Sequence, residues 1–340
     1  MTEITRVTPG QINESTVIDD VNSFEDESGA EVIEQVPAKP HVYVIHHCDA
    51  DGWAAGAIAM ATLASPSIEM SNYPTQYGKP LPIDINVLTD KDAVFILDFS
   101  YDREILEDIN KRVKSLVVLD HHESMREKIA DLPYVTFDLT KSGVLLAWEH
   151  FVDPSFVPPN IQLLDAYDLW NKNHPEYSWN DIASFHLGCV PRMDELGFWL
   201  TIVNDFRLNQ NVMATGRELY GDVVNRAEEL KVDVLSGQFK VMGTNVFFCH
   251  NKLHISLVSD LLYNDEALGC PVTIMAFETE EGWVLSIRSK SDSPLTALEI
   301  AKVFNGGGHV LAAGGKINEQ IGQTDLEAYV AQVLWEKLGR

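Results

Sequence analysis

The fold of this chain is decided by the stretch HVYVIHHCDADG, residues 41–52. Its first half, HVYVIHH, is a short apolar run rich in β-branched residues, which predicts a buried strand. The small residues of DGWAAGAIAMATLA, residues 51–64, predict a helix that packs closely on a sheet. A buried strand that runs straight into such a helix is typical of a βαβ unit.

The same alternation continues along the chain. Two more strands are predicted at VFILDFS, 94–100, and SLVVLDHH, 115–122. Helices are predicted at YDREILEDINKRV (101–113), KSGVLLAWEHF (141–151) and IQLLDAYDLW (161–170). Strands that alternate with helices imply right-handed crossovers and a parallel sheet. Ligands of such α/β folds bind at the carboxyl ends of the strands.

A change of pattern divides the chain further. Residues 198–238 are mainly helical in character and predict a connector. Strand-like segments follow in KVMGTNVFFCH (240–250), PVTIMAFETE (271–280) and GWVLSIRSK (282–290), and then come the helix PLTALEIAKVF (294–304) and the loop NGGGHVLAAGG (305–315). We therefore expect an α/β protein with an acidic tail (1–40), a parallel-sheet domain (41–205), a helical connector (206–238) and a smaller α+β domain (239–335).

The charge of the chain limits its partners. The 340 residues include 25 Lys and Arg against 51 Asp and Glu, a formal net charge of −26. Nine of the carboxylates fall in residues 1–40, which predicts a flexible acidic tail. So acidic a protein is a poor partner for long duplex nucleic acid and for anionic membranes. A small anionic substrate stays compatible with it, because a bound metal ion can reverse the local field.

Targeting and cysteine signals are sparse. The sequence has neither an apolar run of transmembrane length nor an apolar signal region near residue 1. Its four cysteines are Cys48, Cys189, Cys249 and Cys270, which are too scattered for a disulfide framework or a cysteine zinc site. The expected location is the reducing cytoplasm.

Ionisable residues gather where the predicted strands end. His46, His47, Asp49 and Asp51 follow the first strand, although two aspartates in such a turn can also serve as helix caps. Asp98 ends the second strand; it too could simply cap the following helix.

The third strand ends in Asp120, His121 and His122. These three strands bring their ends to one crevice, so carboxylates and imidazoles converge there. Hard oxygen ligands with a few imidazoles suit manganese or magnesium. So many ligands favour two ions bridged by a shared aspartate, an arrangement that can clamp a phosphoryl group.

Three further features are candidates for the same site. Asp165 and Asp168 are three residues apart, so on a helix they share a face that either completes the metal site or is merely solvated. Tyr77, in TQYGKP, is either a substrate contact or an ordinary turn residue.

The third feature is a glycine-rich loop with a distant arginine. Gly306, Gly307 and Gly308 leave backbone N–H groups open to a phosphate, and His309 could add a donor, but most such loops are only turns. Arg288 could clamp a phosphate with two hydrogen bonds, or be an ordinary surface residue.

Taken in order, the motifs HHCDADG, LDFS, LDHH, DAYDLW, SIRS and NGGGHVLAAGG resemble those of the DHH phosphoesterases that carry a C-terminal DHHA1 domain. The resemblance covers about residues 41–335. It implies an N-terminal parallel-sheet DHH domain, a helical connector and a smaller DHHA1-type α+β domain. It also implies a dinuclear manganese centre, with magnesium as the alternative metal, and homodimers, which are common in the family.

The resemblance assigns roles by position. His46 or His47 would hold one metal with Asp49, and the choice is open because the family's usual histidine position is Ile45 here. Asp51, His121 and one of Asp165 and Asp168 would hold the other metal, and Asp98 would bridge the two. Asp120 and His122 would be catalytic, with His122 facing the phosphate. Arg288 and the loop 306–309 would bind the far end of the substrate.

The activity implied is hydrolysis of phosphoester bonds in small nucleotides by metal-activated water, without a protein nucleophile. Short oligonucleotides and cyclic dinucleotides are the favoured substrates. Phosphoadenosine phosphate or polyphosphate is an alternative. A further alternative is an inactive relative that binds a nucleotide or a partner, although the intact Asp and His motifs argue against it.

Overall fold

A computed structural model describes residues 24–25, 31–32 and 39–339 of the chain. The chain divides into two compact units, 1–39 and 40–340. In the first, β1 (Phe24–Glu25) pairs antiparallel with β2 (Glu31–Val32). The rest of the predicted acidic tail lies outside the described residues. The domain boundaries predicted at 205 and 238 fall inside the second unit and stay predictions.

The second unit begins with a five-stranded sheet. The strands lie in the order β4-β3-β5-β6-β7, and every neighbouring pair is parallel. Their bounds are β3 (His41–His47), β4 (Glu69–Thr75), β5 (Ala93–Leu97), β6 (Ser115–Asp120) and β7 (Val135–Phe137). The predicted parallel sheet is confirmed, and the sequence had not indicated its edge strands β4 and β7.

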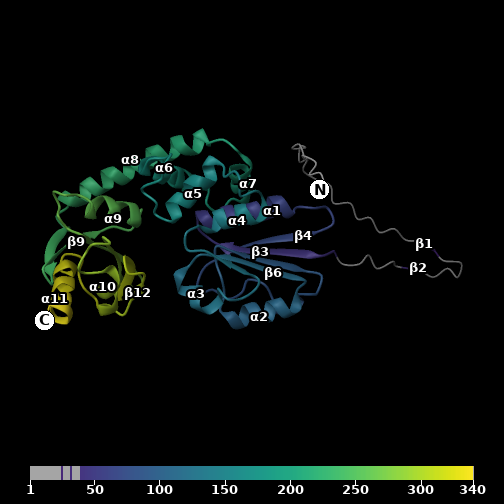
Figure 1. The fold of residues 1–340 in the computed structure, drawn as a ribbon. Helices are drawn as coiled ribbons and strands as arrows, with labels where there is room; N and C mark the ends of the chain where they lie inside the picture. The colour runs from purple at the N-terminus through teal and green to yellow at the C-terminus, as the bar shows by residue number, and fades with distance from the viewer. Residues whose placement is uncertain (1–23, 26–30, 33–38, 340) are drawn as a thin grey trace. The chain divides into compact units, whose positions relative to one another are not determined.

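Helices cover both faces of this sheet. α1 (Ala50–Leu63) and α4 (Gly143–Phe151) lie on one face, and α2 (Arg103–Arg112) and α3 (Glu123–Ile129) on the other, as Figure 1 shows. Strand β3, between β4 and β5, serves both faces by alternation: Val44 packs with the α1 side and Ile45 with the α2 side. Both side chains are fully buried, which explains the continuous apolar run in the sequence.

Helices then lead to a second sheet. They are α5 (Pro159–Asp168), α6 (Trp179–Cys189), α7 (Leu196–Asn204) and the long α8 (Gln210–Val232), with a short 3₁₀ turn at Val190–Arg192; another such turn, Ile85–Val87, lies between β4 and β5. α6 and α8 approach closely at two glycines. A Cβ on Gly216 would lie 1.7 Å from the carbonyl oxygen of Ser184, and one on Gly188 would lie 2.0 Å from that of Val212. Only glycine permits this contact.

The second sheet is mixed, with the strand order β12-β13-β11-β10-β9-β8. Only β9 and β10 run parallel to each other; the other pairs are antiparallel. The strands are β8 (Gly237–Val241), β9 (Thr244–His250), β10 (Val272–Thr279), β11 (Gly282–Ser289), β12 (Gly307–Gly308) and β13 (Ala312–Ile317). The predicted α+β character of this part is confirmed.

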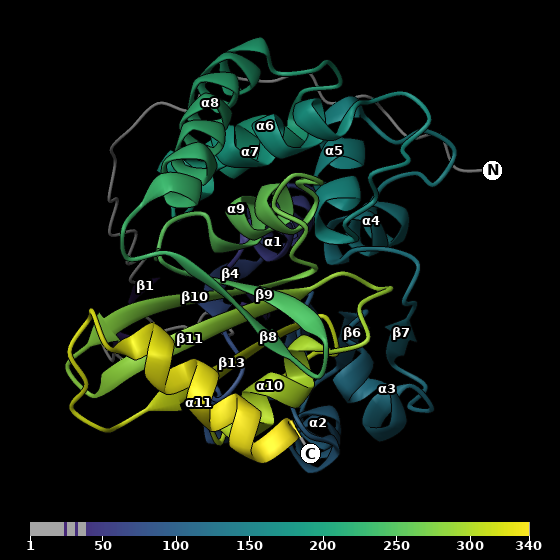
Figure 2. The same cartoon turned by 90° about the vertical axis from the view of Figure 1, so that its left-hand side faces the viewer.

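Three helices pack on the second sheet. α10 (Ala297–Val303) and α11 (Leu326–Leu338) share a core with one face of it, while α9 (Ile255–Tyr263) packs on the other face together with α6 and α8 (Figure 2). In the part of the chain that the structure describes, no helix is long and apolar enough to cross a bilayer.

The structure corrects three predicted elements. Residues 240–250 are a hairpin and not one strand, because Met242 and Gly243 both have positive φ (51° and 81°), as a two-residue hairpin turn requires. The predicted strand 94–100 stops at Leu97, since Asp98 adopts a left-handed conformation with φ 54°. The strand 115–122 stops at Asp120.

We predict opposite effects for two alanine substitutions in α8. Gly216→Ala places a methyl group against the backbone of α6, so we expect it to destabilise the fold by about 1–3 kcal/mol. Gly221→Ala meets nothing within 4 Å and should stabilise the fold by about 0.5–1 kcal/mol. Urea unfolding of the full chain measures both. Equal midpoints for the two variants would contradict this account of the α6–α8 contact.

Candidate metal centre

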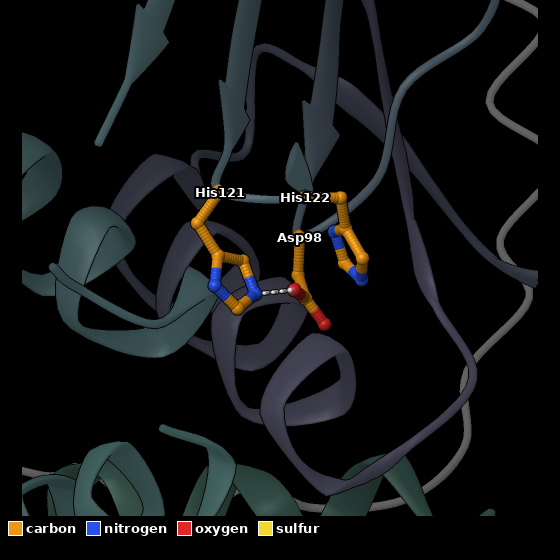
Figure 3. A group of neighbouring side chains, drawn as sticks. All are labelled: Asp98, His121 and His122. Carbon is orange, nitrogen blue, oxygen red and sulfur yellow. Dashed lines mark hydrogen bonds and ion pairs between the residues drawn. The ribbon is translucent and has the colours of Figure 1, made fainter. Parts of the chain in front are cut away.

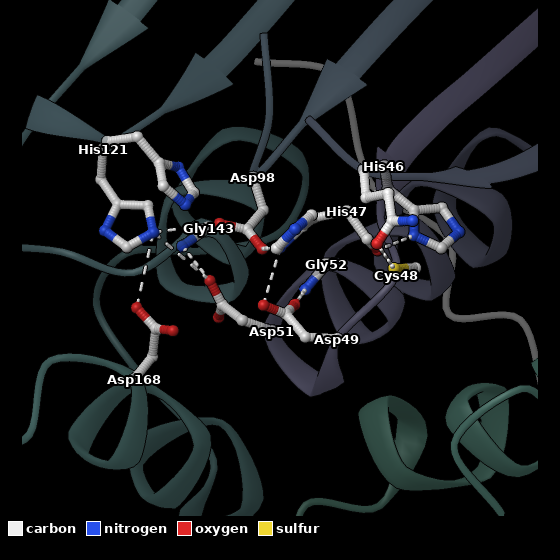
Figure 4. A network of polar contacts seen from close by, with 12 residues as sticks. His46, His47, Cys48, Asp49, Asp51, Gly52, Asp98, His121, Gly143 and Asp168 are labelled. Atoms are coloured by element: carbon white, nitrogen blue, oxygen red, sulfur yellow. Dashed lines mark hydrogen bonds and ion pairs between the residues drawn. The ribbon is translucent and has the colours of Figure 1, made fainter. Parts of the chain in front are cut away.

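The ionisable side chains singled out in the sequence gather at the carboxyl ends of β3, β5 and β6. Figure 4 shows them as one network, with Asp168 and His121 at one end and His47 and Asp49 at the other. The parallel sheet explains the convergence, because neighbouring parallel strands end at the same edge.

One group of possible ligands consists of His47, Asp49 and Asp98. His47 Nδ1 lies 2.7 Å from Asp49 Oδ2 and 3.7 Å from Asp98 Oδ2. Asp49 also caps α1, because its Oδ1 accepts a hydrogen bond from the Gly52 N–H at 2.9 Å. The capping interpretation of Asp49 is thus correct, and its second oxygen still faces the group.

A second group consists of Asp51, His121 and Asp168. His121 Nε2 lies 3.4 Å from Asp168 Oδ2 and 3.8 Å from Asp51 Oδ2. The first turn of α4 orients the Asp51 side chain. The carboxylate accepts hydrogen bonds from the Gly143 N–H at 2.5 Å and from the Val144 N–H at 2.9 Å. A helix N-terminus favours a carboxylate at this place.

Asp98 stands between the two groups. Its Oδ1 lies 3.0 Å from His121 Nε2, while its Oδ2 points to His47 (Figures 3 and 4). Asp98 is 1% exposed, and the left-handed backbone turns its side chain out of the strand direction toward the cluster. Asp98, His121 and His122 also form a third group of possible ligands.

Asp120 organises the turn that follows β6. Its Oδ1 accepts from the backbone N–H groups of His121 (2.8 Å) and His122 (3.1 Å) and from Nδ1 of His122 (2.8 Å). This bond fixes the His122 ring and makes Nδ1 the protonated nitrogen. The other oxygen of Asp120 is buried and has no hydrogen-bond partner among the described residues.

The buried carboxylates repel one another. Burial raises the pKa of Asp51, Asp98 and Asp168 above the ordinary value, and the neighbouring carboxylates raise it further, most strongly for Asp98 and Asp168. Asp49 is the exception. Its side chain is half-exposed, and although partial desolvation acts in the same direction, the hydrogen bond and the charge of His47 prevail and lower its pKa.

The two histidines of the cluster shift in opposite directions. Burial would lower the pKa of His47, but the bond to Asp49 and the nearby carboxylates raise it above the ordinary value. Burial lowers the pKa of His121, against the attraction of Asp51. A neutral His121 has a free lone pair on one ring nitrogen, which is the form that binds metals.

The donor set fits divalent cations. Asp98 Oδ2 is buried without a hydrogen-bond partner among the described residues, although it sits amid other carboxylates. Carboxylate oxygens with a few imidazole nitrogens suit manganese or magnesium. His47, Asp49 and Asp98 could hold one ion and Asp51, His121 and Asp168 another, with Asp98 beside His121 able to reach the second ion as well.

Two of the predicted ligands lie outside these groups. His46 is fully buried and points to the opposite face of the sheet from His47, with its ring 4.8 Å from Trp53. Its Nδ1 donates to the carbonyl of His47 at 2.6 Å, and burial lowers its pKa to about 4.

The other is Asp165, whose Oδ1 accepts from the Ser142 N–H at 2.9 Å. Burial raises its pKa to about 6. The geometry therefore brings His47 and Asp168 into the cluster and leaves His46 and Asp165 beside it.

The predicted substrate-binding residues lie on the second sheet. In the described part of the chain, neither a hydrogen bond nor an ion pair joins them to the cluster. Arg288 donates to Ser286 (3.1 Å), Ser256 (3.3 Å) and the carbonyl of Ile287 (2.9 Å), and burial lowers its pKa.

Gly306, Gly307, Gly308 and His309 form an exposed strand and turn against β13. Gly306 is required there, since a Cβ would lie 1.8 Å from the carbonyl oxygen of Gly314. Whether this loop binds a phosphate stays a prediction.

Sequence reasoning missed the contribution of α4. Its first residue, Gly143, donates to Asp51, and a Cβ at that position would lie 2.2 Å from Cβ of Asp98. The available signal was the dipeptide Ser142-Gly143 before an apolar run. It indicates a helix whose N-cap is a serine and whose first residue is a glycine. Its role beside two carboxylates 92 and 45 residues away in sequence follows only from the fold.

The arrangement defines a class of protein: an α/β domain with a carboxylate–histidine cluster at its strand ends, followed by helices and a mixed sheet. Solved structures of DHH-superfamily phosphoesterases have the same fold. The pGpG-specific phosphodiesterase PggH of Vibrio cholerae matches with a TM-score of 0.52 at 14% identity, over 87% of this chain and 99% of that one.

Two further structures agree with this assignment. RecJ of Thermus thermophilus, solved in complex with Mn²⁺, matches with a TM-score of 0.52 at 15% identity, over 87% of this chain and 52% of that one. An exopolyphosphatase-related protein of Bacteroides fragilis matches with a TM-score of 0.51 at 14% identity, over 89% of this chain and 94% of that one. The fold is thus that of the DHH phosphoesterases, and the resemblance seen in the motifs is confirmed.

Sequence comparison is less informative. No family model matches the chain. An uncharacterised protein of Acanthamoeba polyphaga mimivirus is 24% identical over 231 residues, which are 65% of this chain. The match spans about half (52%) of the length of that relative.

We predict that the two adjacent histidines differ in metal binding. His47→Asn should weaken Mn²⁺ binding by at least about tenfold, because it removes an imidazole from the first group. His46→Asn keeps a donor toward the carbonyl of His47 and should leave the affinity near that of the parent, while lowering the melting temperature. Isothermal titration calorimetry measures both. The reverse order of affinities would assign the metal to His46.

We also predict that Mn²⁺ stabilises the fold more at pH 7.5 than at pH 5. Without metal, the pKa values of Asp51, Asp98 and Asp168 are raised in the folded protein. The folded state therefore loses stability as the pH rises from the pKa of each group in the unfolded chain through its pKa in the folded chain. A divalent cation binds the charged form and removes this opposition. At 100 times Kd, the melting temperature at pH 7.5 should rise by about 5 °C. Equal melting curves with Mn²⁺ and with chelator would contradict the prediction.

Proposed function

We propose that this protein is a metal-dependent phosphohydrolase that cleaves phosphoester bonds in small nucleotides, with short oligonucleotides or cyclic dinucleotides as substrates. The observation that carries the proposal is that two ligand groups, His47–Asp49–Asp98 and Asp51–His121–Asp168, adjoin at Asp98, whose Oδ1 lies 3.0 Å from Nε2 of His121. When bound there, two divalent ions would supply positive charge for phosphate oxygens and make water acidic enough to act as a nucleophile near neutral pH. Manganese is the expected metal, as in the RecJ structure.

The protein's own residues suit this chemistry. Asp120 holds Nδ1 of His122, which leaves Nε2 as the ring atom able to exchange a proton or to hydrogen-bond a phosphate oxygen. Asp49 and Asp51 are held by N–H groups at the starts of α1 and α4, so their orientation is set before a ligand arrives. Because of this preorganisation, little reorganisation is needed when charge develops on the phosphate.

A nearby cavity favours a nucleotide over a bare phosphate. It measures about 690 Å³, and its lining includes Trp170, Lys172, Tyr263, Arg288 and Lys290. None of the cluster residues lines it, but one of its lining residues, Trp170, follows Asp168 by two residues in the sequence. Three cations with two aromatic rings suit a phosphate and a base together, and they stand out in a chain of net charge −26.

The same net charge disfavours long strands. Non-specific binding of single strands depends on a basic groove, which so acidic a chain lacks the charge to build. The pGpG-specific PggH is therefore a better guide to the substrate than exonuclease RecJ. Hydrolysis of phosphoadenosine phosphate or polyphosphate, and binding without turnover, are the alternatives that the experiment below separates.

The test is a hydrolysis panel on purified protein. Linear dinucleotides, cyclic dinucleotides, a longer single strand, phosphoadenosine phosphate, polyphosphate and pyrophosphate are each incubated with Mn²⁺, Mg²⁺ or chelator and analysed by chromatography. We expect Mn²⁺-dependent cleavage of dinucleotides.

Two variants control the panel. Asp98→Asn removes the shared carboxylate at constant shape and should abolish cleavage. Asp131→Asn changes an exposed carboxylate paired with Arg103 and should cleave as the parent does. Cleavage that survives in Asp98→Asn or in chelator would contradict the proposed mechanism. Metal binding without turnover of any compound would favour the binding-protein alternative.

A further inference from the structure

The cluster has two ends that differ in their surroundings. Asp168 and His121 lie at one end and His47 and Asp49 at the other (Figure 4). Trp170, which lines the cavity that Arg288 also lines, follows Asp168 by two residues in the sequence. At the opposite end, the neighbour of the histidines is Tyr77, in the turn that follows β4.

Tyr77 is held by contacts with three aromatic rings. Its ring centroid lies 4.6 Å from Phe99, 5.3 Å from His122 in a T-shaped contact and 6.1 Å from His47. Phe99 is itself 1% exposed, so it is a fixed support. These contacts fix the ring beside the residue expected to face the phosphate.

The same ring is open to solvent. Tyr77 is 40% exposed, which makes it one of the few large aromatic side chains of the described part that combine exposure with a contact to the cluster. The next residue, Gly78, has φ 82° and nothing within 4 Å of a Cβ position, so the backbone after Tyr77 is itself loosely surrounded. A flat, supported and exposed ring is what a nucleobase needs for stacking.

We infer that Tyr77 is the stacking platform for one base of the substrate, beside the residue expected to face the scissile phosphate. This inference rests on the proposed phosphohydrolase function and narrows its substrate. With the cavity taking one nucleoside and Tyr77 the other, the preferred substrate has a base on each side of the bond that is cut. Tyr77 then selects dinucleotides over mononucleotides, polyphosphate and pyrophosphate.

A competing role for Tyr77 is to hold the His122 ring in place. In that case every substrate would depend on Tyr77 equally, because His122 acts on the phosphate and not on the base. Stacking, in contrast, affects only substrates that carry the stacked base. The two roles therefore predict different patterns across substrates.

The experiment compares a linear dinucleotide with its two abasic forms, each lacking one base. Stacking contributes about 1–3 kcal/mol per base, so Tyr77→Leu should lower kcat/KM on the complete dinucleotide roughly 5- to 150-fold. One of the two abasic forms should lose this dependence on Tyr77. Pyrophosphate, if cleaved, should be unaffected by the substitution.

Matched variants support the interpretation. Tyr77→Phe keeps the ring and should recover most of the loss. Phe156→Leu removes an exposed ring (52%) whose aromatic neighbour is Phe206, and it should leave kcat/KM unchanged. An equal loss on all substrates, or no loss on the dinucleotide, would overturn the inference.

A binding measurement separates this inference from the proposed function. Calorimetry with Mn²⁺ compares guanosine monophosphate with ribose 5-phosphate, which lacks the base. We expect the parent to prefer the nucleotide and Tyr77→Leu to lose most of that preference. If the parent hydrolyses nothing but shows this pattern, the proposed function fails and the stacking role stands. If the preference is absent or survives in Tyr77→Leu, the stacking role fails even when hydrolysis is observed.

Discussion

The site depends on one buried carboxylate, Asp98. It lies at the end of β5, is 1% exposed, and has a backbone conformation that few residues other than glycine adopt. Its two oxygens face His121 and His47, so it lies between one residue of each ligand group. Four other carboxylates lie in the same network. Without a cation, the repulsion between these groups destabilises the folded state.

The surrounding elements accommodate this constraint. β5 stops at Leu97 so that Asp98 can turn, and Gly143 leaves the space that the Asp98 side chain occupies. The first turn of α4 gives Asp51 two backbone donors, which partly offset its burial. The left-handed backbone of Asp98, the glycine at position 143 and the first turn of α4 thus lie at one place. Such departures from the most stable local structure are common at functional sites.

Much of this was predictable from the sequence. Apolar runs that end in Asp or His identified the strands and the edge where ligands meet, since strand direction in a parallel sheet is uniform. The choice of His47 over His46 needed the phase of β3, because adjacent residues point to opposite faces. Strand β4 was missed because Pro74 and a polar composition hide an edge strand. Gly143 was beyond reach, and the sequence left Tyr77 open between a substrate contact and a turn residue, since the neighbours of both are distant in sequence and are joined only by packing.

The most direct test of the account is anomalous diffraction at the manganese edge from crystals grown with Mn²⁺. The account predicts two peaks roughly 3.5–4 Å apart. One should contact His47 and Asp49, the other Asp51, His121 and Asp168, and both should contact Asp98. A peak bound by His46 or Asp165, or no peak at Asp98 in crystals soaked well above Kd, would contradict it.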